Sequence, residues 1–140
     1  MTLAIVSAMP EEQAALLARL QAHRRERHAG RDWHHGRLAG HDVVLVLSGI
    51  GKVAAAITAT LLLQRHGATA LLFTGVAGGI GADVRVGDVV VGTGFLQHDL
   101  DASPIFPRWE LPGRGVSRLA ADAAWSRRLA DAVRREHGEP

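Results

Sequence analysis

Cysteine is absent from the 140-residue sequence, which excludes a disulfide scaffold and any metal site built from thiolates. Long apolar runs are absent too, because the longest fall far short of the ~20 residues that a membrane-spanning helix needs. Residues 1–7 contain no basic segment, and no signal-peptide cleavage pattern follows them. These features predict a soluble, cytoplasmic protein with no membrane partner, and the lack of cysteine fits a reducing compartment.

Lysine is scarce as well, since Lys52 is the only one and arginine carries nearly all of the positive charge. The net charge is only +2, so the pI near 10.3 reflects the very high pKa of arginine and not a basic surface. Residues 23–31 (HRRERHAGR) form one basic cluster, but it lacks the interleaved aromatic residues of single-strand binders. We predict the cationic end of a helix and a solvated loop here, and no nucleic-acid partner.

Short apolar runs alternate with segments of helical pattern, which is typical of an α/β fold with strands buried on both faces. Pro10 suits the first turn of a helix, where its missing N–H costs nothing. The predicted strands cover residues 3–6, 32–38, 42–47, 69–73 and 88–91, and the predicted helices cover residues 10–20, 52–65 and 117–137. We therefore expect a mixed central sheet flanked by helices, with an irregular segment over residues 96–115.

Two glycine-rich segments follow predicted strands, yet neither is a familiar nucleotide-binding loop. A P-loop needs a glycine five residues before Gly51 and a Ser or Thr after the lysine, but Val46 and Val53 occupy those positions. Residues 75–81 lack the third glycine of the dinucleotide fingerprint. Nicotinamide and flavin binding are therefore not expected.

Three loops follow the carboxyl ends of predicted strands: residues 8–12, residues 48–51 and residues 74–79. In an open α/β sheet, loops at this edge line the ligand crevice. The first loop brings the carboxylates Glu11 and Glu12. Spacing alone favours ordinary tight turns and first-turn helix charges, so from the residues a converging site stays only an alternative.

Four segments in a fixed order carry a family resemblance. They are Ala8-Met9-Pro10-Glu11-Glu12, Ser48-Gly49-Ile50-Gly51-Lys52-Val53-Ala54-Ala55, Thr74-Gly75-Val76-Ala77-Gly78-Gly79 and Val86-Gly87-Asp88-Val89-Val90. In order and spacing, these segments resemble the methylthioadenosine/S-adenosylhomocysteine nucleosidases of the purine nucleoside phosphorylase superfamily. The resemblance implies a nucleoside phosphorylase-like α/β fold and hydrolysis of the N-glycosidic bond of adenine thionucleosides.

The resemblance also assigns residues. Glu12 matches the family carboxylate that positions and deprotonates the attacking water, a role that suits a group able to stabilise an oxocarbenium-like ribose. The substrate-binding positions that it implies are Ala8, Met9, Ile50, Val76, Ala77 and Gly78. Phe106 and Pro112 match positions that contribute to a neighbouring subunit's pocket, so a homodimer is implied. The resemblance implies no metal and no cofactor.

Two departures from the family keep alternatives open. Many members have Ser or Thr where this chain has Val76, so a futalosine hydrolase is one alternative, and a nucleoside phosphorylase is another. The family fold continues with a glutamate that binds the ribose hydroxyls and an aspartate that protonates adenine, and no segment after Arg118 matches either. We therefore expect residues 1–140 to be the N-terminal part of one such domain, with little or no activity alone, or a non-catalytic truncated product.

One local cluster raises the question of a metal. His98, Asp99 and Asp101 lie within four residues, and their side chains are of the kind that ligate cations. The resembling family has an acidic, histidine-containing loop at this position and uses no metal. We predict a solvated loop here.

Overall fold

The computed structural model describes residues 2–137, and the chain forms two compact units, one up to Gly78 and one from Gly79 onwards. The first unit contains a sheet and two helices, and the second contains a two-stranded ribbon and one helix. That the whole chain belongs to a single domain stays a prediction.

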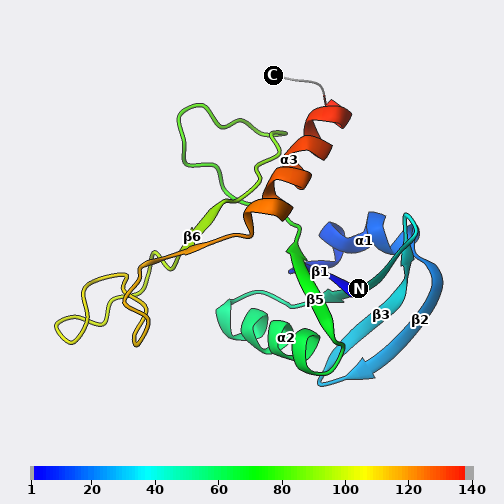
Figure 1. Ribbon diagram of the computed structural model, residues 1–140, viewed down its shortest axis with the longest axis horizontal. Coiled ribbons are helices and arrows are strands. Elements are labelled where there is room, and N and C mark those ends of the chain that lie inside the picture. The colour runs from blue at the N-terminus through cyan, green and yellow to red at the C-terminus, as the bar shows by residue number, and fades with distance from the viewer. Residues whose placement is uncertain (1, 138–140) are drawn as a thin grey trace. The chain divides into compact units, whose positions relative to one another are not determined.

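A five-stranded sheet is the centre of the first unit (Figure 1). Its strands are β1 (Thr2–Ser7), β2 (Gln21–His28), β3 (Arg31–Leu38), β4 (His41–Leu47) and β5 (Ala68–Phe73). They lie in the order β2-β3-β4-β1-β5, and β1 pairs in parallel with both β4 and β5, whereas β2, β3 and β4 are antiparallel neighbours. The predicted mixed sheet is confirmed.

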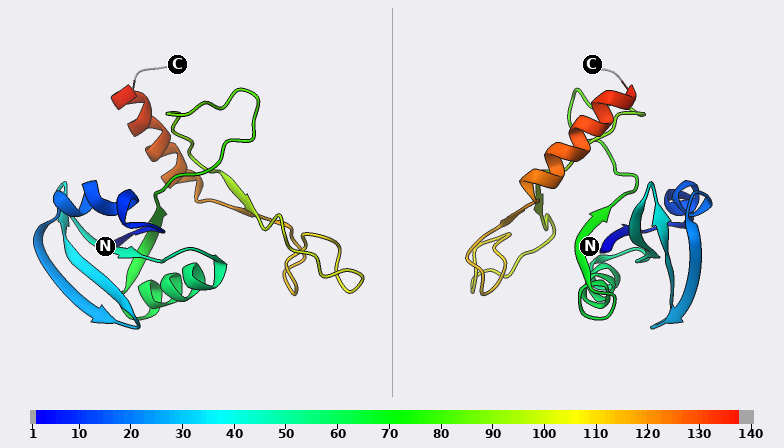
Figure 2. Two further views of the ribbon diagram at one scale, coloured as in Figure 1. Left: turned by 180° about the vertical axis from the view of Figure 1, so that it is seen from behind. Right: turned by 45° about the vertical axis from the view of Figure 1, so that its right-hand side comes forward.

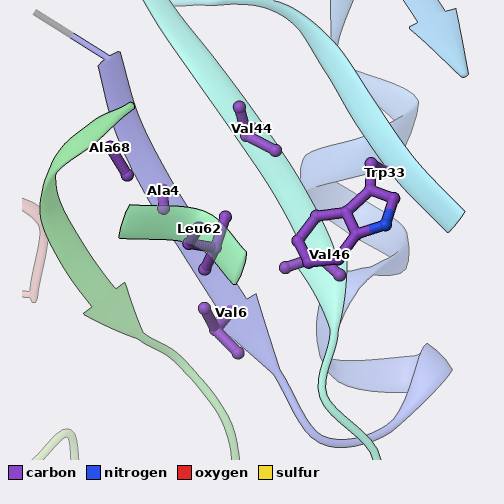
Figure 3. Packing of buried hydrophobic residues seen from close by; sticks show 7 residues of the cluster. All are labelled: Ala4, Val6, Trp33, Val44, Val46, Leu62 and Ala68. Carbon is purple, nitrogen blue, oxygen red and sulfur yellow. The ribbon is translucent and has the colours of Figure 1, made fainter. Parts of the chain in front are cut away.

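Two helices, α1 (Pro10–Ala18) and α2 (Lys52–Gln64), pack on opposite faces of this sheet (Figure 2). Successive residues of a strand point to opposite faces, so Ile5 of β1 faces α1 while Ala4 and Val6 face α2. Figure 3 shows how Leu62 of α2 inserts into the core on its side. This cluster consists of Ala4, Val6, Trp33, Val44, Val46, Leu62 and Ala68.

The prediction for the arginine-rich cluster is wrong, because residues 21–28 form strand β2 and not a helix end with a loop. The helix stops at Ala18, and β2 pairs along β3 at the edge of the sheet. Arg25 and Arg27 both donate hydrogen bonds to Asp32 Oδ2 of β3, at 2.8 and 2.9 Å. Whether a polar segment forms an edge strand depends on its pairing with the neighbouring strand and not on its own hydropathy pattern, so that pattern did not reveal β2.

The predicted strand at residues 88–91 is also wrong, since this apolar segment is irregular. Val89 and Val90 are exposed, and the segment pairs with no other strand among the residues that the structure describes. A strand needs a neighbour for its backbone N–H and C=O groups, so an apolar run alone does not make one.

The second unit contains an antiparallel pair, β6 (Gly94–Leu96) and β7 (Arg118–Ala120), followed by α3 (Ala123–His137). The predicted helix start at Ser117 is wrong, because Asp122 caps α3: its Oδ1 accepts the N–H groups of Ala124 and Trp125, both at 2.9 Å. Within the described residues, no helix has the length and apolarity needed to cross a membrane.

The two neighbouring leucines of α2 give a test of this packing. Leu62 is fully buried whereas Leu63 is 48% exposed. We expect Leu62→Ala to lower the free energy of unfolding by about 2–5 kcal/mol, because it leaves a cavity under α2. Leu63→Ala should cost about 1 kcal/mol or less. Urea unfolding of both variants measures the difference, and equal losses would contradict the described packing of α2.

Candidate active site

Glu12 lies in the first turn of α1, directly after the carboxyl end of β1. Its side chain turns back toward that loop, where Oε2 accepts the backbone N–H groups of Ala8 and Met9, each at 2.9 Å. Met9 is the residue that precedes the helix, so Glu12 caps the helix to which it belongs. The neighbouring Glu11 is exposed.

The other oxygen of Glu12 joins α1 to a second loop. Glu12 Oε1 accepts the N–H of Val76, at 3.0 Å, in the loop that follows β5. The preceding Gly75 makes this approach feasible, because a Cβ at that position would lie 2.7 Å from Glu12 Oε1. The carboxylate thus holds the loops after β1 and β5 together.

These three backbone donors set the charge of Glu12. Hydrogen bonds from the N–H groups of Val76, Met9 and Ala8, the Val76 bond contributing most, lower the pKa of the Glu12 carboxyl below its usual 4.5 despite an opposing effect of desolvation. The group is therefore a carboxylate at neutral pH. Because folding lowers its pKa, it stabilises the fold above pH 4.5, and this contribution is lost as the pH falls through the lowered value.

The third loop reaches the same edge of the sheet through β4. Ser7 and Leu47 are partners at the ends of β1 and β4, and the Ser48 N–H donates to the Ser7 carbonyl oxygen at 2.8 Å. Ile50 follows in this loop and is 81% exposed. The loops after β1, β4 and β5 therefore share one edge, as their positions after strands predict.

The structure places the other candidate residues as follows. Ala8 and Met9 are partly exposed beside Glu12, and Val76, Ala77 and Gly78 are exposed in the loop after β5. Phe106 and Pro112 belong to the second unit, and their assignment to a neighbouring subunit's pocket stays a prediction. Sequence reasoning treated Gly75 only as part of a glycine-rich loop and missed that it makes room for the carboxylate.

Asp101 and the His98 carbonyl group make hydrogen bonds within the loop around residues 98–109. Asp101 Oδ1 accepts the backbone N–H and the hydroxyl of Ser103, at 3.0 and 2.7 Å, and the His98 carbonyl oxygen accepts the Trp109 indole N–H at 2.9 Å. This arrangement is an exposed, hydrogen-bonded loop, as predicted.

A cavity of about 460 Å³ adjoins the loops after β1 and β4. Its lining includes Ala8, Arg27, Arg31, Asp32, Ser48 and Gly49. Both guanidinium groups at this cavity already have protein partners. Arg27 donates to Asp32, and Arg31 Nε donates to Thr58 Oγ1 at 2.8 Å.

Comparison with known proteins agrees with this architecture. A family model described as the phosphorylase superfamily matches residues 2–139. The chain belongs to the phosphorylase superfamily. It is similar to the curated 5'-methylthioadenosine/S-adenosylhomocysteine nucleosidase of Chromohalobacter salexigens, with 45% identity over 100 residues, 71% of this chain and 43% of the relative. The nucleosidase of Bacillus thuringiensis is 40% identical over 114 residues, 81% of this chain and 49% of the relative. The chain therefore spans just under half the length of these relatives.

Solved structures show the same relation. The nucleosidase of Colwellia psychrerythraea, determined in complex with adenine, has a TM-score of 0.93 at 33% identity, covering 99% of this chain and 57% of that one. The S-adenosylhomocysteine nucleosidase of Streptococcus pyogenes, in complex with 5-methylthiotubericidin, has a TM-score of 0.92 at 30% identity, covering 98% and 58%. The predicted fold and the resemblance to nucleosidases are confirmed.

The contact between Gly75 and Glu12 gives a testable prediction. In a carbon-13 NMR titration, the pKa of the wild-type Glu12 carboxyl should lie below 4.5. Gly75→Ala should raise this pKa, because the new methyl group displaces the carboxylate from the Val76 N–H. Gly78→Ala is the matched control, since a Cβ there meets nothing within 4 Å. Equal pKa values in all three proteins would contradict this geometry.

Proposed function

We propose that this chain supplies the water-activating part of a site that hydrolyses the N-glycosidic bond of methylthioadenosine or S-adenosylhomocysteine. The observation that carries the proposal is the Glu12 carboxylate, ionised and fixed by three backbone N–H groups where the loops after β1 and β5 meet. The curated relatives bear the name of this activity, and one related structure was determined with adenine.

The chemistry of the reaction explains why a fixed carboxylate is useful. The bond between the anomeric carbon and the adenine nitrogen breaks with its electron pair leaving on adenine, and the ribose acquires oxocarbenium character. An ionised carboxylate stabilises this positive charge. Water then adds to the anomeric carbon, and its acidity rises as the new C–O bond forms, so that Glu12 accepts the proton at that stage. The three N–H bonds hold the carboxylate in one orientation before the substrate arrives.

The remaining candidate binding residues lie in the three loops around Glu12. We infer that Ala8, Met9 and the loop residues Val76, Ala77 and Gly78 border the ribose and the base, and that the exposed Ile50 provides an apolar contact for the alkylthio group. The Val76 side chain has no hydroxyl that could bind the nucleoside or the water. Its role is therefore to orient Glu12 through its backbone N–H.

Hydrolysis is favoured over phosphorolysis by the charges near the site. A carboxylate repels phosphate, and the arginines at the adjoining cavity are engaged by Asp32 and Thr58. A phosphorylase would need cations available for the phosphate. The proposal therefore retains water as the nucleophile.

We further infer a homodimer, a cytoplasmic location and a role in methionine salvage for the protein. The support for the dimer is the outer side of α2, where Val53 is 75% exposed and Ile57 and Leu63 are nearly half-exposed. Apolar side chains gathered on one helix face favour association with another protein surface. A second copy of this chain is the occupant that the family resemblance implies.

Adenine release from methylthioadenosine tests the activity. Because the chain spans under half the length of its curated relatives, we would assay it alone and joined to the remaining segment of the Chromohalobacter relative. In the joined protein, Glu12→Gln should reduce the rate by about 100-fold or more, because the amide cannot accept a proton. Glu11→Gln, at the adjacent exposed position, should leave the rate unchanged. For the 140-residue chain alone we expect little or no release.

The products and the competing substrate separate the alternatives. Formation of free thioribose at a rate independent of phosphate would support hydrolysis, whereas formation of a ribose 1-phosphate would indicate a phosphorylase. Faster cleavage of futalosine than of methylthioadenosine would reassign the substrate. Full activity of the Glu12→Gln protein would disprove the role of Glu12.

Sedimentation velocity tests the dimer. We expect Ile57→Lys to convert a dimer to a monomer, because a charge on the apolar face of α2 would be desolvated in the interface. Ala15→Lys adds the same charge at an exposed position of α1, on the opposite face of the sheet, and should leave the dimer intact. A monomeric wild-type chain would contradict this part of the proposal.

A further inference from the structure

Three side chains with metal-binding atoms converge in a cluster that does not include Glu12. Glu26 belongs to β2, His35 belongs to β3, and His66 follows the end of α2. One ligand atom from each of them lies within 4.8 Å of the other two. Two imidazoles and a carboxylate are the donor set of many zinc sites, which keep a fourth position for water.

Two nitrogen atoms in this cluster are buried without a partner. Neither His35 Nε2 nor His66 Nε2 makes a hydrogen bond in the described structure, and His35 Nε2 lies 3.8 Å from Glu26 Oε2, too far for one. A buried polar atom without a partner is unfavourable and calls for an explanation, of which a bound ion is one. A neutral imidazole has one ring nitrogen with a lone pair, and the two unpartnered Nε2 atoms are the ones placed to bind an ion.

The surrounding residues hold the cluster in place. The His66 ring stacks on Trp33, with centroids 4.3 Å apart, and the Trp33 indole N–H donates to the His28 carbonyl oxygen at 3.0 Å. Arg65 donates to Glu26 Oε1 at 2.8 Å, which leaves Oε2 directed toward His35. Hydrogen bonds of this kind orient the ligands of known metal sites.

We propose that Glu26 Oε2, His35 Nε2 and His66 Nε2 bind one zinc ion, with water as the fourth ligand. Zinc bonds to nitrogen and oxygen are about 2.0–2.2 Å long, so tetrahedral ligand atoms lie roughly 3.4 Å apart. The cluster reaches this size by side-chain rotations that draw the three atoms together. Arg24 Nη1, 3.6 Å from Glu26 Oε2, has a largely exposed side chain that can move into water.

The position of the ion determines its effect. It joins the β2–β3 hairpin to the segment after α2, and none of its ligands belongs to the residues proposed for the nucleoside. Arg24 and Arg65 place positive charge beside Glu26, so binding is weaker than at a closed four-ligand structural site. The ion therefore acts as a stabilising clamp that responds to the supply of zinc.

Calorimetric titration with zinc chloride, on the 140-residue chain without a histidine tag, tests the proposal. The wild type should bind one equivalent, and His35→Gln/His66→Gln should weaken binding by at least about tenfold. The matched control is His23→Gln/His34→Gln, which removes an equally close pair joined by a 2.8 Å contact on the same hairpin. The control should bind like the wild type. No binding by the wild type, or equal loss in both double variants, would overturn the proposal.

Two further measurements keep the outcome clear if the double variant does not fold. Glu26→Gln retains both imidazoles and should also weaken zinc binding, whereas unchanged affinity would remove Glu26 from the site and overturn the proposed ligand set. Cobalt(II) can take the place of zinc and, unlike zinc, absorbs visible light. Its spectrum should be that of a four-coordinate site in the wild type and in the control. A six-coordinate spectrum would mean a hydrated surface ion and would contradict the proposal.

Discussion

The parallel pairing of β1 with both β4 and β5 is the constraint on which the candidate site depends. Neighbouring parallel strands end at the same edge of the sheet, so the loops that follow β1, β4 and β5 must lie close together. The pairing is itself a consequence of apolar sequence, because β1 and β4 are covered by α1 on one face and α2 on the other, and β5 contributes Ala68 to the core under α2. Glu12 then accepts hydrogen bonds from two of these loops, which fixes the position of one loop relative to the other.

The elements that sequence predicted correctly are those whose signal is local. The apolar runs at β1, β4 and β5 and the alanine- and leucine-rich α2 define their own structure, and Gly67 with its φ of 61° follows the end of α2 as expected. β2 could not be recognised from its own pattern, because its polar side chains are stabilised by the neighbouring strand β3 and by Arg65, which is 39 residues from Glu26 in the sequence. The strand prediction for residues 88–91 was wrong for the opposite reason: the segment is apolar, as a buried strand would be, but it has no neighbouring strand to pair with its backbone groups.

The same distinction between local and long-range sequence signals applies to the candidate site. The role of Glu12 is implied only by the family resemblance, whereas its place in the first turn of α1 follows from Pro10. Its bond to Val76 depends on the arrangement of two loops more than 60 residues apart in sequence, as does the need for glycine at position 75. The cluster of Glu26, His35 and His66 is harder still to foresee, because its donors come from three separate segments with no characteristic spacing.

Glu12 has both a structural role and a proposed catalytic role, and this combination affects how such a chain can change in evolution. Catalytic groups are commonly a burden on folding, so that their loss stabilises the protein and inactive variants persist. Here the proposed catalytic carboxylate is also the cap of α1 and the link to the loop after β5. Even Glu12→Gln, which abolishes the chemistry, keeps one acceptor oxygen where the carboxylate has two, so either the cap or the link is lost. Selection for a well-folded α1 would therefore preserve the carboxylate even in a lineage in which no nucleoside was being cleaved.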